Sequence, residues 1–138
     1  MYFEDSKFFN TVYCYKYETY FGDFYFSEKF IIAELKHGIH YNWDMIEILM
    51  DEVIKFYGKD VKLKYIANRV NSFSVDPNVW SKLDKIYNLI TNIAIVSYNR
   101  RATINAMIEK HLFGKNMTSF ETLEEAINWT SNLENIAS

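Results

Sequence analysis

The stretch VKLKYIANRVNSFSVDPNVWSKLDKIYNLITNIAIVSYN, residues 61–99, decides the fold because a strand pattern, a helix pattern and a second strand pattern follow one another. Alternating apolar residues over 61–67 predict a strand with one buried face. Asp76 followed by Pro77 is typical of a helix N-cap and first helical position, and apolar residues then recur at helical spacing. Residues 92–98 are apolar almost throughout, which favours a central strand buried on both faces. This order predicts two parallel strands joined by a right-handed crossover.

Three more strand patterns precede this unit, at 13–17, 23–26 and 30–35, and the short segment 27–29 is a plausible turn. The first two patterns predict a leading antiparallel hairpin. The first 30 residues hold 13 of the 25 aromatic residues, so this third of the chain favours extended structure. Most of these rings are expected to form a packed sheet face; an aromatic platform for a ligand is the alternative.

Helical spacing of apolar residues predicts further helices on both sides of the central unit. One begins near residue 42, with a capping box of Asp44 and Glu47, and ends at Gly58. The last opens with a capping box of Thr122 and Glu125 and runs to about residue 133, after a short edge strand at 118–120. The helix between them ends at Gly114 and is marked by one apolar face, comprising Ile104, Met107, Ile108, His111 and Leu112.

These patterns predict an α/β fold with a mixed, largely parallel sheet, a leading antiparallel hairpin and about four helices. The chain has 138 residues, of which 49% are hydrophobic and 24% charged, which is the composition of one globular domain, residues 1–138. A chain of this length can bury a core without disulfides or metals.

Composition and motifs exclude several functional classes. The net charge of −3 disfavours nucleic-acid binding, which usually shows a basic excess. No apolar run reaches the length of a membrane span and no signal peptide is visible, so we expect no stable membrane insertion and a cytoplasmic location. His37 and His40 flank a turn glycine without a completing carboxylate motif, and Cys14 has no partner that would activate it. We therefore expect no metal, no cofactor and no enzymatic activity.

The polar loops after the two central strands are the candidate site, because ligands of open α/β sheets bind beyond the carboxyl ends of parallel strands. This surface comprises Arg69, Asn71, Ser72, Ser74, Asp76, Asn99 and Arg100. Arg100 and Arg101 oppose the dipole of the helix they begin, so they either contact an anion or a partner or are solvated surface arginines. Ser72 and Ser74 either make local turn and cap hydrogen bonds or are sites of phosphorylation or polar ligand contact.

Four segments carry a resemblance to a known family: FIIAELKHGIHYNWDMIEILMD at 30–51, YIANRVNSFSVDP at 65–77, IAIVSYN at 93–99 and FETLEEAINW at 120–129. They resemble small bacterial STAS/SEC14-like proteins of the SpoIIAA-like, anti-sigma-factor-antagonist superfamily, of the type found in Flavobacteria. The resemblance covers about residues 24–134 and leaves 1–23 as an aromatic-rich extension or an extra strand.

The resemblance implies a mixed sheet with helices and a non-enzymatic role in binding a protein partner. In antagonist-type members a kinase modifies a serine in the loop before the second helix, a position that Ser72 and Ser74 match here. That loop usually resembles D-S-S-G, whereas this chain has S-F-S-V-D-P without glycine, so the kinase partner is not carried over. Other relatives imply an alternative, SEC14-like binding of a small apolar or anionic lipid-type ligand. The aromatic excess near the N-terminus also suggests a homodimer face.

Overall fold

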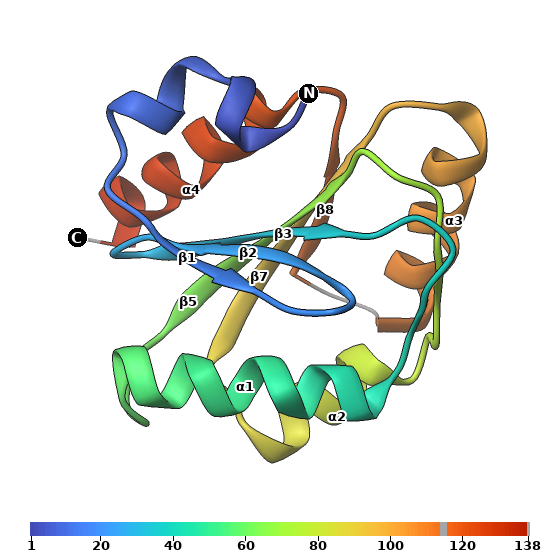
Figure 1. Ribbon diagram of the computed structural model, residues 1–138, viewed down its shortest axis with the longest axis horizontal. Helices are drawn as coiled ribbons and strands as arrows, with labels where there is room; N and C mark the ends of the chain where they lie inside the picture. Colours follow the sequence, from blue (N-terminus) through green and yellow to red (C-terminus); the bar gives the residue numbers. More distant parts are fainter. Residues whose placement is uncertain (114–115, 138) are drawn as a thin grey trace.

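The computed structural model describes the backbone of residues 1–113 and 116–137 and the side chains of residues 1–112 and 116–131. It is an α/β fold in which four α-helices of the described chain pack around a mixed sheet (Figure 1). The strands are β1 Tyr15–Glu18, β2 Gly22–Phe26, β3 Phe30–Leu35, β4 His40–Tyr41, β5 Leu63–Arg69, β6 Ser74–Val75, β7 Ile90–Ser97 and β8 Met117–Phe120. The helices are α1 Trp43–Tyr57, α2 Val79–Ile86, α3 Arg100–Phe113 and α4 Leu123–Ala137.

The main sheet has six strands in the order β1-β2-β3-β5-β7-β8. The strands β1, β2 and β3 form the predicted antiparallel part, and β3, β5, β7 and β8 run parallel. The turn at 27–29 joins β2 to β3, and the Ser27 hydroxyl both donates to the Phe30 carbonyl and accepts from the Phe30 amide. The apolar strand β7 lies between β5 and β8, which confirms the expectation of a central parallel strand.

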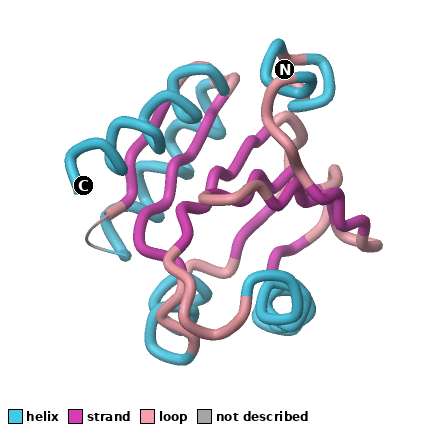
Figure 2. The backbone as a smooth tube through the Cα atoms, turned by 90° about the vertical axis from the view of Figure 1, so that its left-hand side faces the viewer, coloured by secondary structure: helices cyan, strands magenta, loops and turns pink. Residues whose placement is uncertain are grey.

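The connecting helices α1, α2 and α3 lie on one face of the sheet because each right-handed parallel connection steps one strand in the same direction, whereas α4 follows the last strand and covers the other face. One core contains residues from α1, α2 and α3, including Leu49, Leu83 and Ala106. The opposite core contains Leu123 and Ile127 of α4. Figures 1 and 2 show α1 and α2 on one side of the sheet and α4 on the other.

The N-terminal segment completes the second face. Two 3₁₀ turns, Phe3–Asp5 and Lys7–Asn10, lie beside α4 on that side of the sheet (Figure 1). The Phe3 ring is fully buried and packs on Tyr25, with ring centroids 4.8 Å apart. Residues 1–23 are therefore part of the domain and supply both this cover and strand β1.

The helix ends agree in part with the predicted signals. Gly58 ends α1 with a φ of 89°, and at the start of α4 the Thr122 hydroxyl accepts from the Glu125 amide and donates to the Glu125 carboxylate. The predicted capping box at Asp44 is wrong, because Asn42 is the N-cap of α1 and its side chain accepts from the Met45 amide. The predicted helix end at Gly114 lies outside the described residues.

The start of α2 also differs from the prediction. The helix begins at Val79, two residues after Pro77, so Asp76 is not its N-cap. The Asp76 carboxylate instead accepts from the Asn78 amide, and its carbonyl accepts from the Val79 amide, which closes a turn ahead of the helix. The side chain of aspartate readily accepts hydrogen bonds from nearby backbone amides. The Asp76–Pro77 pair therefore marks this turn, and the helix begins two residues after Pro77.

Candidate interaction surface at the carboxyl edge of the sheet

The loops after β5 and β7 share one edge of the sheet, as the strand order requires. These strands pair in parallel register to their last residues, so that Arg69 lies opposite Ser97. The two loops therefore start next to each other. One continues into β6 and α2, and the other starts α3 after only two residues, so the predicted surface is built from loop 70–78 and α3.

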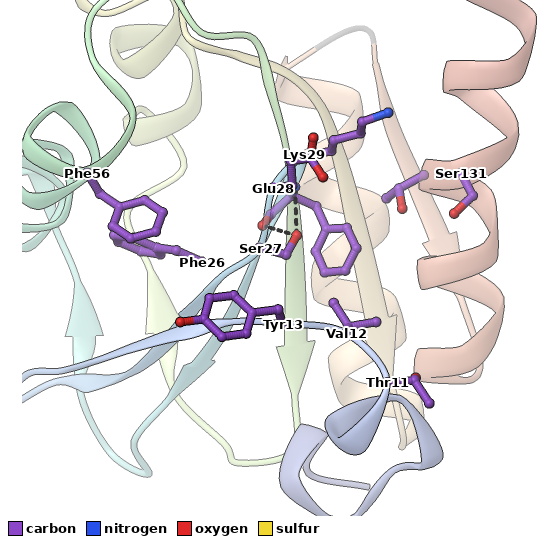
Figure 3. Close-up of a pocket in the computed structure, with 11 residues that line it drawn as sticks. Thr11, Val12, Tyr13, Phe26, Ser27, Glu28, Lys29, Phe56 and Ser131 are labelled. Carbon is purple, nitrogen blue, oxygen red and sulfur yellow. Dashed lines mark hydrogen bonds between the residues drawn. The ribbon is translucent and has the colours of Figure 1, made fainter.

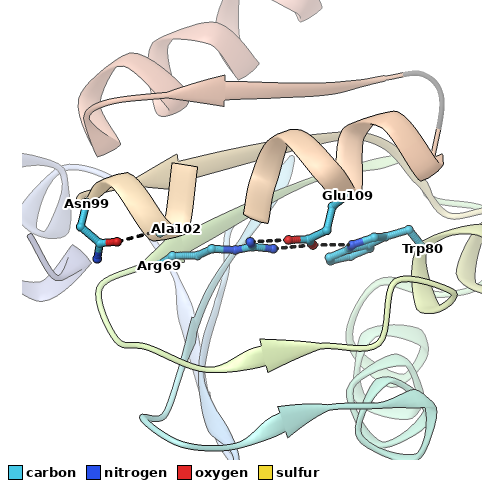
Figure 4. A network of polar contacts seen from close by, with 5 residues as sticks. All are labelled: Arg69, Trp80, Asn99, Ala102 and Glu109. Atoms are coloured by element: carbon cyan, nitrogen blue, oxygen red, sulfur yellow. Dashed lines mark hydrogen bonds and ion pairs between the residues drawn. The ribbon is translucent and has the colours of Figure 1, made fainter. Parts of the chain in front are cut away.

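Arg69 lies beneath this surface and holds its parts together. Its side chain is only 6% exposed, and its two terminal nitrogens donate to the Glu109 carboxylate of α3 at 2.5 and 2.6 Å. The same carboxylate accepts from the Trp80 indole nitrogen of α2 at 2.9 Å (Figure 4). A bidentate arginine–carboxylate pair is among the strongest polar contacts in a protein. Arg69 thus joins β5, α3 and α2 and presents no free guanidinium to a partner; sequence reasoning missed Glu109, which is far from Arg69 along the chain.

The loop after β5 is held by a second, two-stranded sheet that the sequence did not indicate. Strand β6 pairs in parallel with β4, which lies between β3 and α1 along the chain. The amides of Gly38, Ser74 and Asp76 donate to the carbonyls of Ser72, Ile39 and Tyr41. The four residues of β4 and β6 are too few to show the alternation of apolar and polar residues that marks a strand in a sequence. This pairing is therefore visible only in the structure. The loop is consequently an ordered surface.

The predicted polar residues of this loop divide between structural and exposed roles. Asn71 donates to the Leu35 carbonyl and accepts from the Tyr2 hydroxyl, so it links the loop to β3 and to the N-terminus. Ser72 and Ser74 are exposed, and the Ser74 oxygen lies 2.7 Å from His40 Nδ1. Both hydroxyls are therefore at the surface of an ordered loop.

Helix α3 begins beside that loop. Asn99 lies just before the helix, and its side-chain oxygen accepts from the Ala102 amide at 2.8 Å, as an N-cap does (Figure 4). Arg100 and Arg101 are both exposed in the first turn. No ion pair within the described side chains engages either arginine. Two uncompensated cations therefore lie at the positive end of the α3 dipole.

The apolar face that marks α3 in the sequence points to solvent. Ile104 is 47% exposed, Met107 62%, Ile108 54% and Leu112 55%, and His111 is exposed among them. Among the described side chains of α3, those of Ala106 and Glu109 are buried, on the opposite side of the helix. Glu109 must face inward to pair with Arg69, and this pairing fixes the rotation of α3 so that the larger apolar residues lie outside. We call Ile104, Met107, Ile108 and Leu112 the α3 stripe.

A groove separates the loop from the α3 stripe. It has a volume of about 200 Å³, and its walls include Phe73, Val75 and Pro77 from the loop and Ile108 from α3. Arg69 and Glu109 lie at its base, and the Arg69 guanidinium is 5.5 Å from the centre of the Phe73 ring. Mostly apolar walls on two ordered elements make a recess for an apolar side chain next to an exposed apolar helix face.

On the opposite face of the sheet, a buried polar cluster fastens the N-terminal segment. Glu34 Oε2 accepts from the Phe3 amide and from the Asn68 side-chain amide, each at 2.7 Å. The same Asn68 nitrogen donates to the Met1 carbonyl, and its oxygen accepts from the Tyr98 hydroxyl. Burial raises the pKa of the Glu34 carboxyl, while the hydrogen bonds from Phe3 and Asn68 partly oppose this rise.

Glu34→Gln is expected to remove a pH dependence of stability. Because the folded pKa of Glu34 is raised, the folded chain binds its proton at a higher pH than the unfolded chain, and the free energy of unfolding falls as the pH rises from the ordinary value of 4.5 to the raised value. Glutamine keeps an oxygen acceptor for both donors but does not titrate. Urea unfolding across this pH range should show a flatter profile for Glu34→Gln than for wild type. The exposed Glu28→Gln is the control, and equal profiles for all three proteins would contradict the assignment.

Two open grooves flank residues 11–13 at the other end of the sheet. The larger, of about 560 Å³, is lined by Tyr13, Phe26, Phe30 and Phe56 among others (Figure 3). The second, of about 530 Å³, lies on the other side of the same segment, next to Tyr25. Tyr13 is 93% exposed between them. This aromatic surface therefore combines open grooves with a strongly exposed ring.

The remaining candidate groups are placed as follows. Burial raises the pKa of Cys14 to about 11, so its reactive thiolate is disfavoured. Among the described residues, no group of three or more histidine, cysteine or carboxylate side chains lies close enough to hold a metal ion. In the same part of the chain, no helix is both long and apolar enough to cross a membrane. No protein-family model, curated protein or solved structure matches this chain.

Proposed function

We propose that this chain is a non-enzymatic protein-interaction or regulatory domain of the STAS-like, SpoIIAA-like type that acts in the cytoplasm. Its contact surface is the α3 stripe together with loop 71–77. The observation that carries the proposal is the outward apolar face of α3, because exposed, contiguous apolar residues on a well-packed element are typical of interaction sites.

The polar chemistry of the carboxyl edge supports binding over catalysis. Arg69, Glu109 and Trp80 bond to one another, and Asn68 and Glu34 hold the N-terminal segment. The first three groups fix α3 and the two ends of the loop that border the groove, and the other two fix the N-terminal segment. A surface built in this way is rigid, which lowers the entropy lost when a partner binds.

Ser72 and Ser74 supply a means of regulating this surface. Both hydroxyls are exposed on the ordered loop, and Ser72 lines a small recess together with Arg101 and Asn105 of α3. A phosphate on Ser72 would add negative charge beside Arg101 and the N-terminal end of α3, where it is electrostatically favoured. It would also change the charge of the surface that a partner meets.

The proposed function is tested by purifying the tagged chain from the cells that produce it and identifying the partner that co-purifies. Ile108→Asp places a charge in the middle of the α3 stripe and is expected to weaken binding of the identified, purified partner by about tenfold or more. Ile86→Asp is the matched control, because Ile86 is similarly exposed, at 57%, at the far end of α2. Calorimetric titration of both variants gives the comparison, and equal affinities would remove the proposed surface.

The alternative function, SEC14-like binding of a small apolar or anionic lipid-type ligand, is favoured by the groove between Tyr13 and Phe56. Native mass spectrometry of the same purified protein distinguishes the two functions. A bound small molecule that is lost in Phe56→Ala supports the alternative, whereas a partner protein that is lost in Ile108→Asp supports the interaction domain.

A further inference from the structure

The exposed charges of α3 are all of one sign. Arg100, Arg101 and Lys110 are exposed, and the only carboxylate of this helix, Glu109, is buried in its pair with Arg69. None of the three exposed cations forms an ion pair with a described carboxylate. This local excess stands out because the whole chain has a net charge of −3.

The cations and the apolar residues occupy the same face. Arg100, Ile104, Met107 and His111 follow one another at spacings of three or four residues, and so do Arg101, Ile104, Ile108 and Leu112. Residues at these spacings are neighbours on a helix surface. The face therefore has a cationic end at the start of α3 and an apolar middle, over a length of about 18 Å at about 1.5 Å per residue.

This arrangement disfavours a second copy of the chain as the occupant. If two α3 helices packed against each other in parallel, the Arg100–Arg101 ends would meet. In an antiparallel pair, each of these ends would meet the Lys110 end of the other copy. Both arrangements bring like charges together without an exposed carboxylate on either helix, and like charges across an interface oppose association.

The surface also suits a protein segment better than a flat bilayer. Loop residues Phe73, Val75 and Pro77 stand beside Ile108 and form the groove described above. A groove of this size accepts a protruding side chain, and helices that bind in grooves insert apolar anchors at helical spacing. The remainder of the chain, with its acidic balance, would be repelled by an anionic membrane.

We propose that the partner of this surface is an acidic amphipathic helix, whose apolar side chains enter the groove and cover the α3 stripe and whose carboxylates meet Arg100 and Arg101. This inference rests on the proposed function and names the chemistry of its partner. Carboxylates at this position neutralise both arginines and also lie at the positive end of the α3 dipole. The acidic residues provide orientation and faster association, and the apolar anchors provide most of the affinity.

The test uses two synthetic amphipathic peptides with the same leucines on one face, one carrying glutamates and the other lysines at the remaining positions. Fluorescence anisotropy at low salt is expected to show wild type binding the acidic peptide about tenfold more tightly than the basic one, with this preference reduced by added salt. Arg100→Glu with Arg101→Glu should reverse the preference. The control is Lys55→Glu with Lys59→Glu, an equal change in charge on exposed residues at the end of α1.

Equal binding of the two peptides, no binding of the acidic peptide, or a preference that survives the double arginine exchange overturns the proposal. Phosphatidylcholine vesicles with and without phosphatidylglycerol form the membrane arm, and binding to the anionic vesicles in place of the acidic peptide also overturns it. The proposed function and this inference can be told apart. If binding of the co-purified partner needs Ile108 but does not depend on Arg100 and Arg101, the interaction domain stands and the acidic helix does not.

Discussion

Glu109→Ala is expected to lower the free energy of unfolding by about 3–5 kcal/mol, because it leaves a buried arginine without a counter-charge. Arg69 and Glu109 are 6% and 7% exposed at their side chains and bond at both nitrogens. Alanine also removes the acceptor of the Trp80 indole N–H. A loss of this size is a large fraction of the stability of an ordinary domain. Urea unfolding followed by circular dichroism measures it.

Two further variants identify the cause of this loss of stability. Lys110→Ala is the control on the same helix, because Lys110 is exposed and adjacent in sequence, and little change is expected. Arg69→Met combined with Glu109→Leu removes both charges and keeps much of the volume, so it should recover most of the stability lost in Glu109→Ala. A loss below about 1 kcal/mol in Glu109→Ala would show that the pair does not act as a buried ionic link.

Phe3→Ala is expected to lower the free energy of unfolding by about 3–5 kcal/mol, the usual cost of truncating a buried phenylalanine. The Phe3 ring is fully buried against Tyr25 on the face of the sheet that α4 also covers. Its amide donates to Glu34, so loosening this turn would also leave a buried carboxylate with one fewer hydrogen bond. The loss therefore combines a cavity with a weakened polar anchor.

Phe9→Ala is the matched control, since Phe9 lies in the same N-terminal segment but is 43% exposed. It should cost much less, because less apolar surface returns to water. Thermal and urea unfolding of the two variants give the comparison. Equal losses in Phe3→Ala and Phe9→Ala would refute the view that the first turn is an integral part of the second core.

Local patterns predicted most of the architecture. The segments 23–26 and 30–35 became β2 and β3, and 92–98 became most of β7, because strand alternation and long apolar runs reflect burial directly. Thr122 with Glu125, and Gly58, marked helix ends because capping depends on residues only a few positions apart. The short pairing of β4 with β6 escaped prediction since it depends on contacts between distant segments.

The structure brings the predicted residues together at the carboxyl edge of the sheet, but the sequence did not indicate which of them turn inward. Parallel order alone places the loops after β5 and β7 side by side, which is why Ser72, Ser74, Asn99 and Arg100 lie on one edge. Sequence could not show that Arg69 turns inward, because its partner Glu109 is 40 residues away.

The sequence by itself determined the order of strands and helices, the mixed sheet and the edge at which polar loops gather, because periodicity and turn chemistry act over a few residues. Only the tertiary structure decided which face of α3 is buried. Helical spacing groups Ile104, Ile108 and Leu112 on one face but does not say which way that face points. The Arg69–Glu109 pair decides it, since two charges buried together must face each other, and the apolar stripe is left exposed to solvent.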